Sequence, residues 1–274
     1  MFKYTDELLA QVMEISTEAF FVEDLAGNVL HCNSAACKMY GYTKDELIGL
    51  NIRDLVPKDA DYLKDEYTRD DVVENEFVLR YALKKDGTVF PIMVNSKIFK
   101  TDNNERLIAF IRDITVEEKL RQELYYQSNY DFLTGLRNRR HIFRLLESLE
   151  KSTCISVVDI DDFKKVNDKY GHLTGDDVLK RLGKLLDSYP SLKAGRLGGE
   201  EFFLIHSTSD IIKARQEINK IQIDFKDATI HLGGLTFSAG VALCRPGISI
   251  EEILKLADAN LYTAKNNGKN KVII

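Results

Sequence analysis

Two short segments carry acidic side chains at positions where a metal ion and a nucleotide could bind. In the first, an apolar, β-branched run ends abruptly in Asp159 and Asp161, as a buried strand does when it delivers an acid to the edge of a sheet. In the second, a Gly-Gly pair at 198–199 predicts a tight hairpin turn that places Glu200 and Glu201 at the start of another strand. We expect these two edges to lie side by side and to form a Mg²⁺ site.

The spacing of the acids favours this chemistry over a structural role. A single Asp or Glu is usually a turn residue, but adjacent like charges at the mouth of an apolar strand raise each other's pKa unless a cation intervenes. Mg²⁺ prefers carboxylates and substrate phosphate oxygens, and the acids at 159, 200 and 201 are compatible with one metal or two. An EF-hand is excluded, because its fifth and sixth loop positions would be Phe163 and Lys164.

The sequence also limits how a nucleotide is held. It contains neither a G-x-x-x-x-G-K-[ST] loop nor a G-x-G-x-x-G motif, so metal and lysines must bind the phosphates. Lys164 follows five residues after Asp159. Asn167, His172 and Asp176 come next, and these polar groups can hydrogen-bond to the edge of a base.

Composition indicates an ordinary globular chain. Its 274 residues, 44% hydrophobic and 30% charged, suffice for about two domains with cores. Apolar runs stay far below the roughly 18 residues of a membrane span, and the first residues lack a signal peptide's apolar segment, so we expect a cytoplasmic protein without a membrane partner. The four cysteines form no C-x-x-C pair and predict reduced core thiols. A formal net charge of −5 argues against a nucleic-acid partner but is compatible with a single nucleotide.

Patterning divides the chain near residue 115. Residues 1–115 alternate short strand-like runs with turns and short helices, one of them opened by a capping box from Thr43 to Glu46, and predict a sheet with helices on one side. Residues 116–130 predict a linker helix with Val116, Leu120 and Leu124 on one stripe. This helix could transmit a rotation or shift between two domains; a solvated spacer is the open alternative.

Strands and helices alternate in residues 131–274. A strand at 154–159 precedes a helix around Val178 and Leu182. A pair of strands on either side of the Gly198-Gly199 turn then precedes a helix around Ile218. A strand at 235–243 and a helix opened by a capping box at Ser249 follow. This order predicts an α+β fold, a mixed sheet with packed helices, as in polymerase palms and nucleotide cyclases.

The first part resembles a PAS sensor domain. The resemblance rests on Asn33-Ser-Ala-Ala, Gly41 to Gly49, Lys85 to Pro91 and Arg112-Asp-Ile-Thr115. It implies a fold but no ligand, because the Asn-Cys-Arg-type helix of flavin-binding relatives is missing. His31 lies in a strand-like run, and we predict a packed core histidine rather than a haem ligand.

The second part closely resembles the GGDEF family, the diguanylate cyclases, along its whole length. Several ordered motifs carry the resemblance: Asp131-Phe-Leu-Thr-Gly-Leu-Arg-Asn-Arg-Arg140, Asp159 to His172, Gly175-Asp176, Gly198-Gly-Glu-Glu-Phe202, Ser238 to Val241, Ala257-Asp258 and Leu261 to Lys265. The fold it implies is the GGDEF fold.

The resemblance implies a metal and phosphate site. Asp159, the backbone carbonyl of Ile160 and Glu200 would ligate Mg²⁺, with Mn²⁺ as an alternative ion, and Glu201 would help at a second metal. The triphosphate would be held by the Phe163 N–H, Lys164, Lys265 and Lys269. At the position of Lys269 the family usually has Arg, so a bidentate grip on phosphate would be weakened there.

It also implies guanine recognition and a reaction. Asn167 and Asp176 would recognise guanine, with His172 near the base or ribose. Two GTP molecules would condense into cyclic di-GMP with release of two pyrophosphates, with Glu200 the best candidate for the base and Lys164 stabilising the transferring phosphoryl group. The product's two-fold symmetry requires a homodimer.

One departure concerns feedback. The family's R-x-x-D product-inhibition motif would fall at Tyr189 and Leu192, so little feedback through that site is expected. Three other functions stay open. They are a catalytically silent GTP-binding module, a cyclase that also accepts ATP, and a PAS-mediated dimerisation scaffold.

Overall fold

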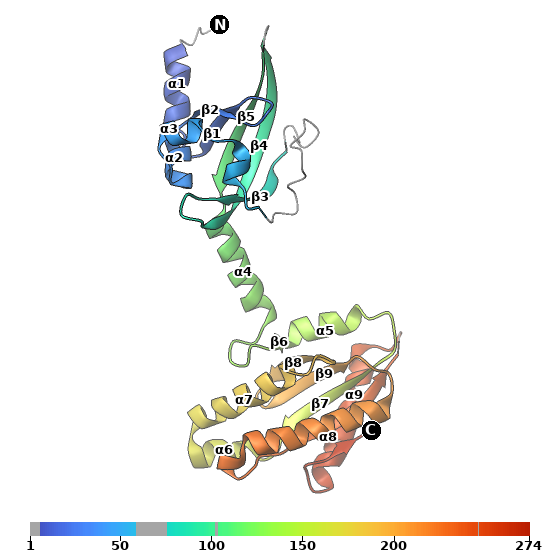
Figure 1. Cartoon of the computed structure of the whole chain (residues 1–274). Coiled ribbons are helices and arrows are strands. Elements are labelled where there is room, and N and C mark those ends of the chain that lie inside the picture. The colour runs from blue at the N-terminus through green and yellow to red at the C-terminus, as the bar shows by residue number, and fades with distance from the viewer. Residues whose placement is uncertain (1–5, 59–75, 102–103, 246) are drawn as a thin grey trace. The chain divides into compact units, whose positions relative to one another are not determined.

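A computed structural model describes residues 6–58, 76–101, 104–245 and 247–274. The chain divides between Gln122 and Glu123 into two compact units (Figure 1). Each unit has its own sheet and its own buried core. No helix within the described ranges is both long and apolar enough to cross a membrane.

The first unit is built on an antiparallel sheet with the strand order β2-β1-β5-β4-β3. Its core lies between this sheet and the short helices that follow β2. The strands are β1 Ala19–Glu23, β2 Val29–Cys32, β3 Val78–Leu83, β4 Val89–Thr101 and β5 Asn104–Asp113. The helices are α1 Asp6–Ile15, α2 Ser34–Tyr40, α3 Lys44–Ile48 and the 3₁₀ turn η1 Ile52–Leu55.

Local sequence signals explain where these helices begin and end. The predicted capping box is confirmed: the Thr43 hydroxyl accepts from the Glu46 N–H at 3.3 Å, and the Glu46 carboxylate accepts from the Thr43 N–H at 2.9 Å. Helix α2 ends at Gly41, which has φ 79°, a left-handed conformation that glycine adopts without steric cost.

The prediction that His31 is a packed core residue is wrong. Strict alternation from the buried Val29 would turn His31 inward, but the β1–β2 register shifts between Val22 and Glu23. The resulting bulge leaves both Leu30 and His31 exposed before Cys32 turns back into the core. All four cysteines are free thiols, and Cys32 and Cys154 are buried.

Helix α4, Thr115–Asn129, contains the boundary between the two units. It coincides with the predicted linker helix. Val116, Leu120 and Leu124 are 66%, 53% and 66% exposed, so the apolar stripe read from the sequence faces solvent in this single chain.

The second unit is built on a mixed six-stranded sheet with the order β11-β10-β7-β9-β8-β6. The pairs β10–β11 and β6–β8 are parallel and the other pairs are antiparallel, as the predicted mixed sheet requires. The strands are β6 Arg137–Asn138, β7 Thr153–Ile160, β8 Leu192–Gly198, β9 Glu201–His206, β10 Phe237–Cys244 and β11 Val272–Ile273. The helices are α5 Arg139–Glu147, α6 Phe163–Tyr170, α7 His172–Asp187, α8 Ile211–Ala228, α9 Ile250–Asn266 and the 3₁₀ turn η3 Ile230–Leu232.

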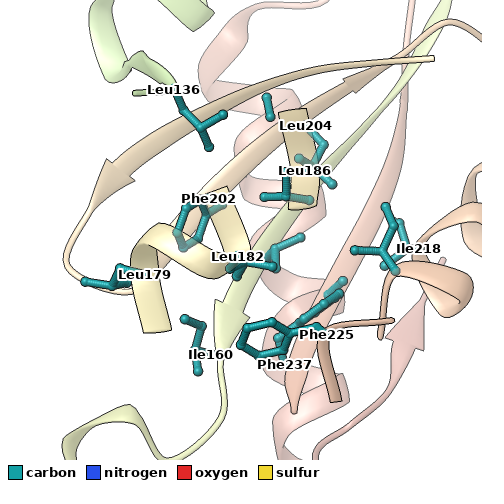
Figure 2. Packing of buried hydrophobic residues seen from close by; sticks show 14 of the residues in the cluster. Leu136, Ile160, Leu179, Leu182, Leu186, Phe202, Leu204, Ile218, Phe225 and Phe237 are labelled. Carbon is teal, nitrogen blue, oxygen red and sulfur yellow. The ribbon is translucent and has the colours of Figure 1, made fainter. Parts of the chain in front are cut away.

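Helices cover both faces of this sheet. Helices α7 and α8 pack on one face, where Leu182, Ile218 and Phe225 meet the strand residues Phe202 and Phe237 (Figure 2). Helices α5 and α9 pack on the opposite face through a separate apolar cluster. Strand β7 is buried along its whole length, as expected of a central strand covered on both sides.

Candidate nucleotide and metal site

Asp159 lies near the carboxyl end of β7, on the face of the sheet that α9 covers. Side chains alternate along a strand, and Ile155 and Val157 belong to the core under α5 and α9. Asp159 continues that row and is only 7% exposed. Its Oδ2 atom lies 2.8 Å from the Nζ of Lys265, in the last turn of α9.

Two further acids surround this ion pair. Glu201 is the direct partner of Asp159 in the β7–β9 ladder, so the two side chains project from the same face. Glu200 lies in the preceding turn, and its carbonyl accepts a hydrogen bond from the Ile160 N–H at 3.4 Å. Burial raises the pKa of Asp159; Lys265 opposes that shift, while the charges of Glu200 and Glu201 add to it.

This donor set fits a hard divalent cation. Like charges directly opposite in a ladder are destabilising without a counter-charge, and Lys265 supplies one positive charge against three acids. Within the described ranges, no three Asp, Glu, His or Cys side chains form a ready-made metal cage. Mg²⁺ does not need one, since it binds through one or two carboxylates together with waters and substrate phosphates.

The Gly-Gly turn between β8 and β9 is held by a residue to which the sequence assigned no role. Gly199 has φ 53°, and its carbonyl accepts from the Arg196 guanidinium at 2.9 and 2.7 Å. The same guanidinium donates to Asp131 at 3.1 Å. Arg196 and Asp131 lie in or beside the motifs quoted above, but they are far apart in the sequence, so no local pattern of residues predicts that they pair.

The expected phosphate contacts gather where α6 begins. Phe163 and Lys164 form its first turn, and Asp162 at the N-cap makes no side-chain cap hydrogen bond, so backbone N–H groups there remain for a ligand. The Lys164 side chain is exposed. Lys269 has φ 60°, and its Nζ lies 2.8 Å from Asp162 Oδ1.

Asp161 is the other acid that the sequence places at the end of strand β7, beside Asp159. It is 6% exposed and accepts from the Thr236 and Ser238 hydroxyls at 2.7 and 2.8 Å and from the Asn270 N–H at 3.0 Å. Asp161 therefore ties the turn that contains Lys269 to the end of β7. It is a positioning residue rather than a free ligand.

The expected guanine-reading residues come from adjacent helices. Gly171 ends α6 and precedes α7, with φ 84°. Asn167 packs over Gly175, whose ideal Cβ would lie 1.9 Å from Asn167 Oδ1, and Asp176 follows in the chain. Asn167 and Asp176 are half-buried, whereas His172 is exposed at the start of α7.

Two family models match the chain. The model described as "Diguanylate cyclase, GGDEF domain" matches residues 128–271, and a PAS-domain model matches residues 17–116. Similar proteins include a "Diguanylate cyclase" of Vibrio cholerae, 32% identical over 93% of this chain and 85% of its own. Diguanylate cyclase DgcM of Escherichia coli is 27% identical over 90% of this chain, which spans 63% of DgcM.

Other similar proteins extend the comparison. Cyclic di-GMP phosphodiesterase PdeB of Shewanella oneidensis is 27% identical, but the match covers only 32% of that protein. Among solved structures, the coiled coil and GGDEF domain of DgcB from Caulobacter crescentus, in complex with c-di-GMP, matches with a TM-score of 0.52 and 30% identity. The match covers 58% of this chain and 91% of the DgcB chain.

Proposed function

Because the chain belongs to the diguanylate cyclase family of GGDEF domains, we propose that it condenses two GTP molecules into cyclic di-GMP and two pyrophosphates. The observation that carries the proposal is the ion pair between the buried Asp159 and the half-buried Lys265, flanked by Glu200 and Glu201 across the β7–β9 ladder. The excess negative charge of such a site is balanced by a divalent cation. Mg²⁺ bound through one or two carboxylates takes substrate phosphate oxygens as further ligands, which suits a nucleoside triphosphate.

In this proposal, Asp159, the Ile160 carbonyl and Glu200 hold Mg²⁺, and Glu201 contributes to a second ion. Bound Mg²⁺ would polarise phosphate oxygens and lower the pKa of the attacking 3′-hydroxyl. Glu200, half-buried in the turn, is the candidate base. Base assistance of this kind accelerates a reaction by about 10²- to 10⁴-fold.

The chain's cations and amides would position the triphosphate. The first-turn N–H of Phe163 binds a phosphate oxygen, and Lys164 stabilises charge on the transferring group. Lys265 exchanges part of its contact with Asp159 for the phosphates. Lys269 must release Asp162 to do the same, and its single ammonium grips less firmly than a forked guanidinium.

Guanine selection would come from the α6–α7 junction. Asp176 accepts from guanine N1–H and its amino group, and Asn167 completes the base contacts, with His172 near the ribose.

One protomer holds one GTP, so two protomers must meet across a two-fold axis to form the product. A GTP-consuming reaction suits the cytoplasm.

The test is product analysis after incubation of the purified chain with GTP and Mg²⁺. Cyclic di-GMP and pyrophosphate should form at a 1:2 ratio. Asp159→Asn, which keeps size but removes charge, should abolish turnover, while Asp187→Asn on the exposed end of α7 should not. Binding of GTP without turnover would support the silent module instead, and equal incorporation of ATP would show that Asp176 does not select guanine.

A cellular assay separates the enzyme from the dimerisation scaffold. If Glu200→Ala leaves the chain's cellular effect unchanged, the scaffold function stands and the cyclase proposal fails.

We also propose that product feedback is weak. Tyr189 donates to Asp224 at 2.5 Å and Leu192 opens β8, where the family motif has a cation and an acid that grip the product. Purified protein should keep most of its activity in low micromolar cyclic di-GMP. Strong inhibition in that range would contradict the proposal.

A further inference from the structure

Asp162 places a negative charge among the groups that would hold the triphosphate. It directly precedes Phe163 and Lys164, which form the first turn of α6. Its Oδ1 atom lies 2.8 Å from the Nζ of Lys269 and 2.9 Å from the Nζ of Lys165. One carboxylate oxygen therefore binds two ammonium groups beside the proposed phosphate contacts.

We propose that Asp162 competes with the phosphates of the substrate for Lys269, and thereby sets how tightly the site holds GTP and pyrophosphate. This proposal rests on the proposed function, in which Lys269 binds the triphosphate. Asp162 is a positioning residue, because it acts through the lysine and not on the reacting atoms. Three observations carry its role: the fixed backbone around the ion pair, the exposure of the pair and the position of Asp162 outside the proposed metal ligands.

The backbone on both sides of this ion pair is held in place. Asp162, Lys269 and Asn270 have φ of 54°, 60° and 49°, and no other non-glycine residue in the described ranges has a positive φ. Left-handed backbone costs free energy at such residues, and it persists where the surroundings over-determine it. The Asn270 N–H donates to Asp161 at 3.0 Å, and the Lys269 N–H donates to the Ala264 carbonyl at 3.1 Å. These hydrogen bonds fix the turn, so Lys269 changes partner by a movement of its side chain alone.

The ion pair is exposed enough to be exchanged. The side chains of Asp162 and Lys269 are 40% and 41% exposed. Exposed ion pairs contribute little free energy, because water solvates both charges and salt screens them. A triphosphate carries several negative charges, so it can take Lys269 from a single carboxylate. The carboxylate therefore weakens phosphate binding without preventing it.

The other ion pair of the site differs in what happens to its acid. Lys265 pairs with Asp159, which in the proposed function binds Mg²⁺ and so gains a new counter-charge when the substrate arrives. Asp162 is not among the proposed metal ligands, and it keeps only the Lys165 ammonium when Lys269 turns to the phosphates. The lost contact lowers the affinity for GTP and is regained when pyrophosphate leaves. Asp162 thus favours product release at the expense of substrate affinity.

Binding of phosphate ligands to the full chain, measured by calorimetry in the presence of Mg²⁺, tests the proposal. One probe is a GTP analogue with a methylene group between the α- and β-phosphorus atoms, which cannot release pyrophosphate, and the other is inorganic pyrophosphate. Asp162→Asn keeps the shape of the side chain and tolerates left-handed backbone, but removes the charge. We expect this variant to bind both probes about 5-fold more tightly than wild type, the upper range for an exposed ion pair. A merely structural defect would weaken binding instead.

Two further variants assign the gain to Lys269. Asp187→Asn, which removes an exposed acid at the last residue of α7, should bind both probes as wild type does. In Lys269→Met protein, adding Asp162→Asn should raise the affinity by no more than about 2-fold, because the lysine for which the acid competes is gone.

The proposal is overturned if Asp162→Asn binds the analogue no more tightly than wild type. It is also overturned if the full gain persists in Lys269→Met protein, which would show that the acid repels phosphates directly. If the analogue binds neither wild type nor Asp162→Asn, the proposed function fails, and the role of Asp162 fails with it. If the analogue binds wild type but the variant gains nothing, only the role of Asp162 fails.

Discussion

At the residue scale, the ion pair between Asp159 and Lys265 is the central charge interaction of the proposed site. Burial raises the pKa of Asp159, and the Lys265 ammonium at 2.8 Å counteracts this. Glu200 and Glu201 add negative charge around the same carboxylate. The lysine therefore offsets part of the rise in the Asp159 pKa that burial and the two glutamates cause.

Replacing Lys265 should disable this arrangement. Lys265→Met keeps the length of the stem but leaves the three acids without their counter-charge and removes a phosphate contact. We expect kcat/KM for GTP to fall by about 10²-fold or more, the usual effect of losing an electrostatic group at a phosphoryl-transfer site. Lys255→Met, exposed on the same helix, is the control. Near-normal turnover of Lys265→Met, measured as pyrophosphate release, would remove Lys265 from the site.

A buried hydrogen-bonded chain elsewhere in the second unit has the residue types of a catalytic triad but a structural role. Ser156 Oγ lies 2.8 Å from His206 Nε2, and His206 Nδ1 lies 2.8 Å from Glu217 Oε2. Ser156 is 0% and His206 2% exposed, so no substrate reaches them. These hydrogen bonds join β7, β9 and α8, and Ser191 also donates to Glu217.

Glu217 should make stability depend on pH. The His206 hydrogen bond, with a smaller contribution from Ser191, lowers the pKa of Glu217 in the folded state. Its stabilisation is therefore present above the unfolded pKa and is lost as pH falls through the folded pKa. Glu217→Gln should cost about 1–3 kcal/mol at pH 7 and flatten the acid limb of stability against pH.

Hydrogen exchange of β7 and β9 amides at pH 4 and pH 7 measures this effect in the full chain. Asp227→Asn, exposed at the end of α8, is the matched control. Unchanged protection in Glu217→Gln would show that the Ser156–His206–Glu217 hydrogen bonds add nothing to stability.

At the element scale, the α6–α7 junction brings together the residues that we propose read the base. The two helices meet at Gly171, and the missing side chain of Gly175 leaves room for Asn167. An added Cβ would lie 1.9 Å from Asn167 Oδ1 and 3.2 Å from the Phe163 ring. The end of a flexible side chain must then move, while the helical backbone suits alanine.

Gly175→Ala should therefore act on substrate binding more than on folding. We expect KM for GTP to rise by roughly 10-fold, because a displaced Asn167 loses about one hydrogen bond to the base. Initial rates against GTP concentration, with amide exchange of α7 as a folding check, measure the effect. Gly49→Ala, whose Cβ would meet only ordinary contacts, is the control. A variant that loses α7 protection instead would show that the glycine is needed for packing.

At the scale of the whole molecule, the proposed reaction needs two protomers. Because the product joins one GTP from each, an inactive protomer should disable its partner. When Asp159→Asn protein is mixed with wild type at constant total concentration, cyclic di-GMP formation should follow the square of the wild-type fraction. Wild type mixed with Asp187→Asn should lose nothing. A linear dependence on the wild-type fraction would show that single chains complete the reaction.

The sequence by itself determined the features that depend on neighbours along the chain. The capping boxes at Thr43 and Ser249, the Gly-Gly turn before Glu201 and the buried strand that ends near Asp159 are local, because turn and cap geometry involve only a few consecutive residues. The ordered motifs likewise predicted the two families that the family models match.

Only the tertiary structure decided which distant groups meet. It paired Asp159 with Lys265, bound Asp161 to the Asn270 turn and joined Arg196 to Asp131. It also turned His31 outward, since a single extra residue in β2 reverses the face on which the next side chain lies. Strand register and helix docking place these side chains, and both result from packing over the whole core, which no short pattern of residues encodes.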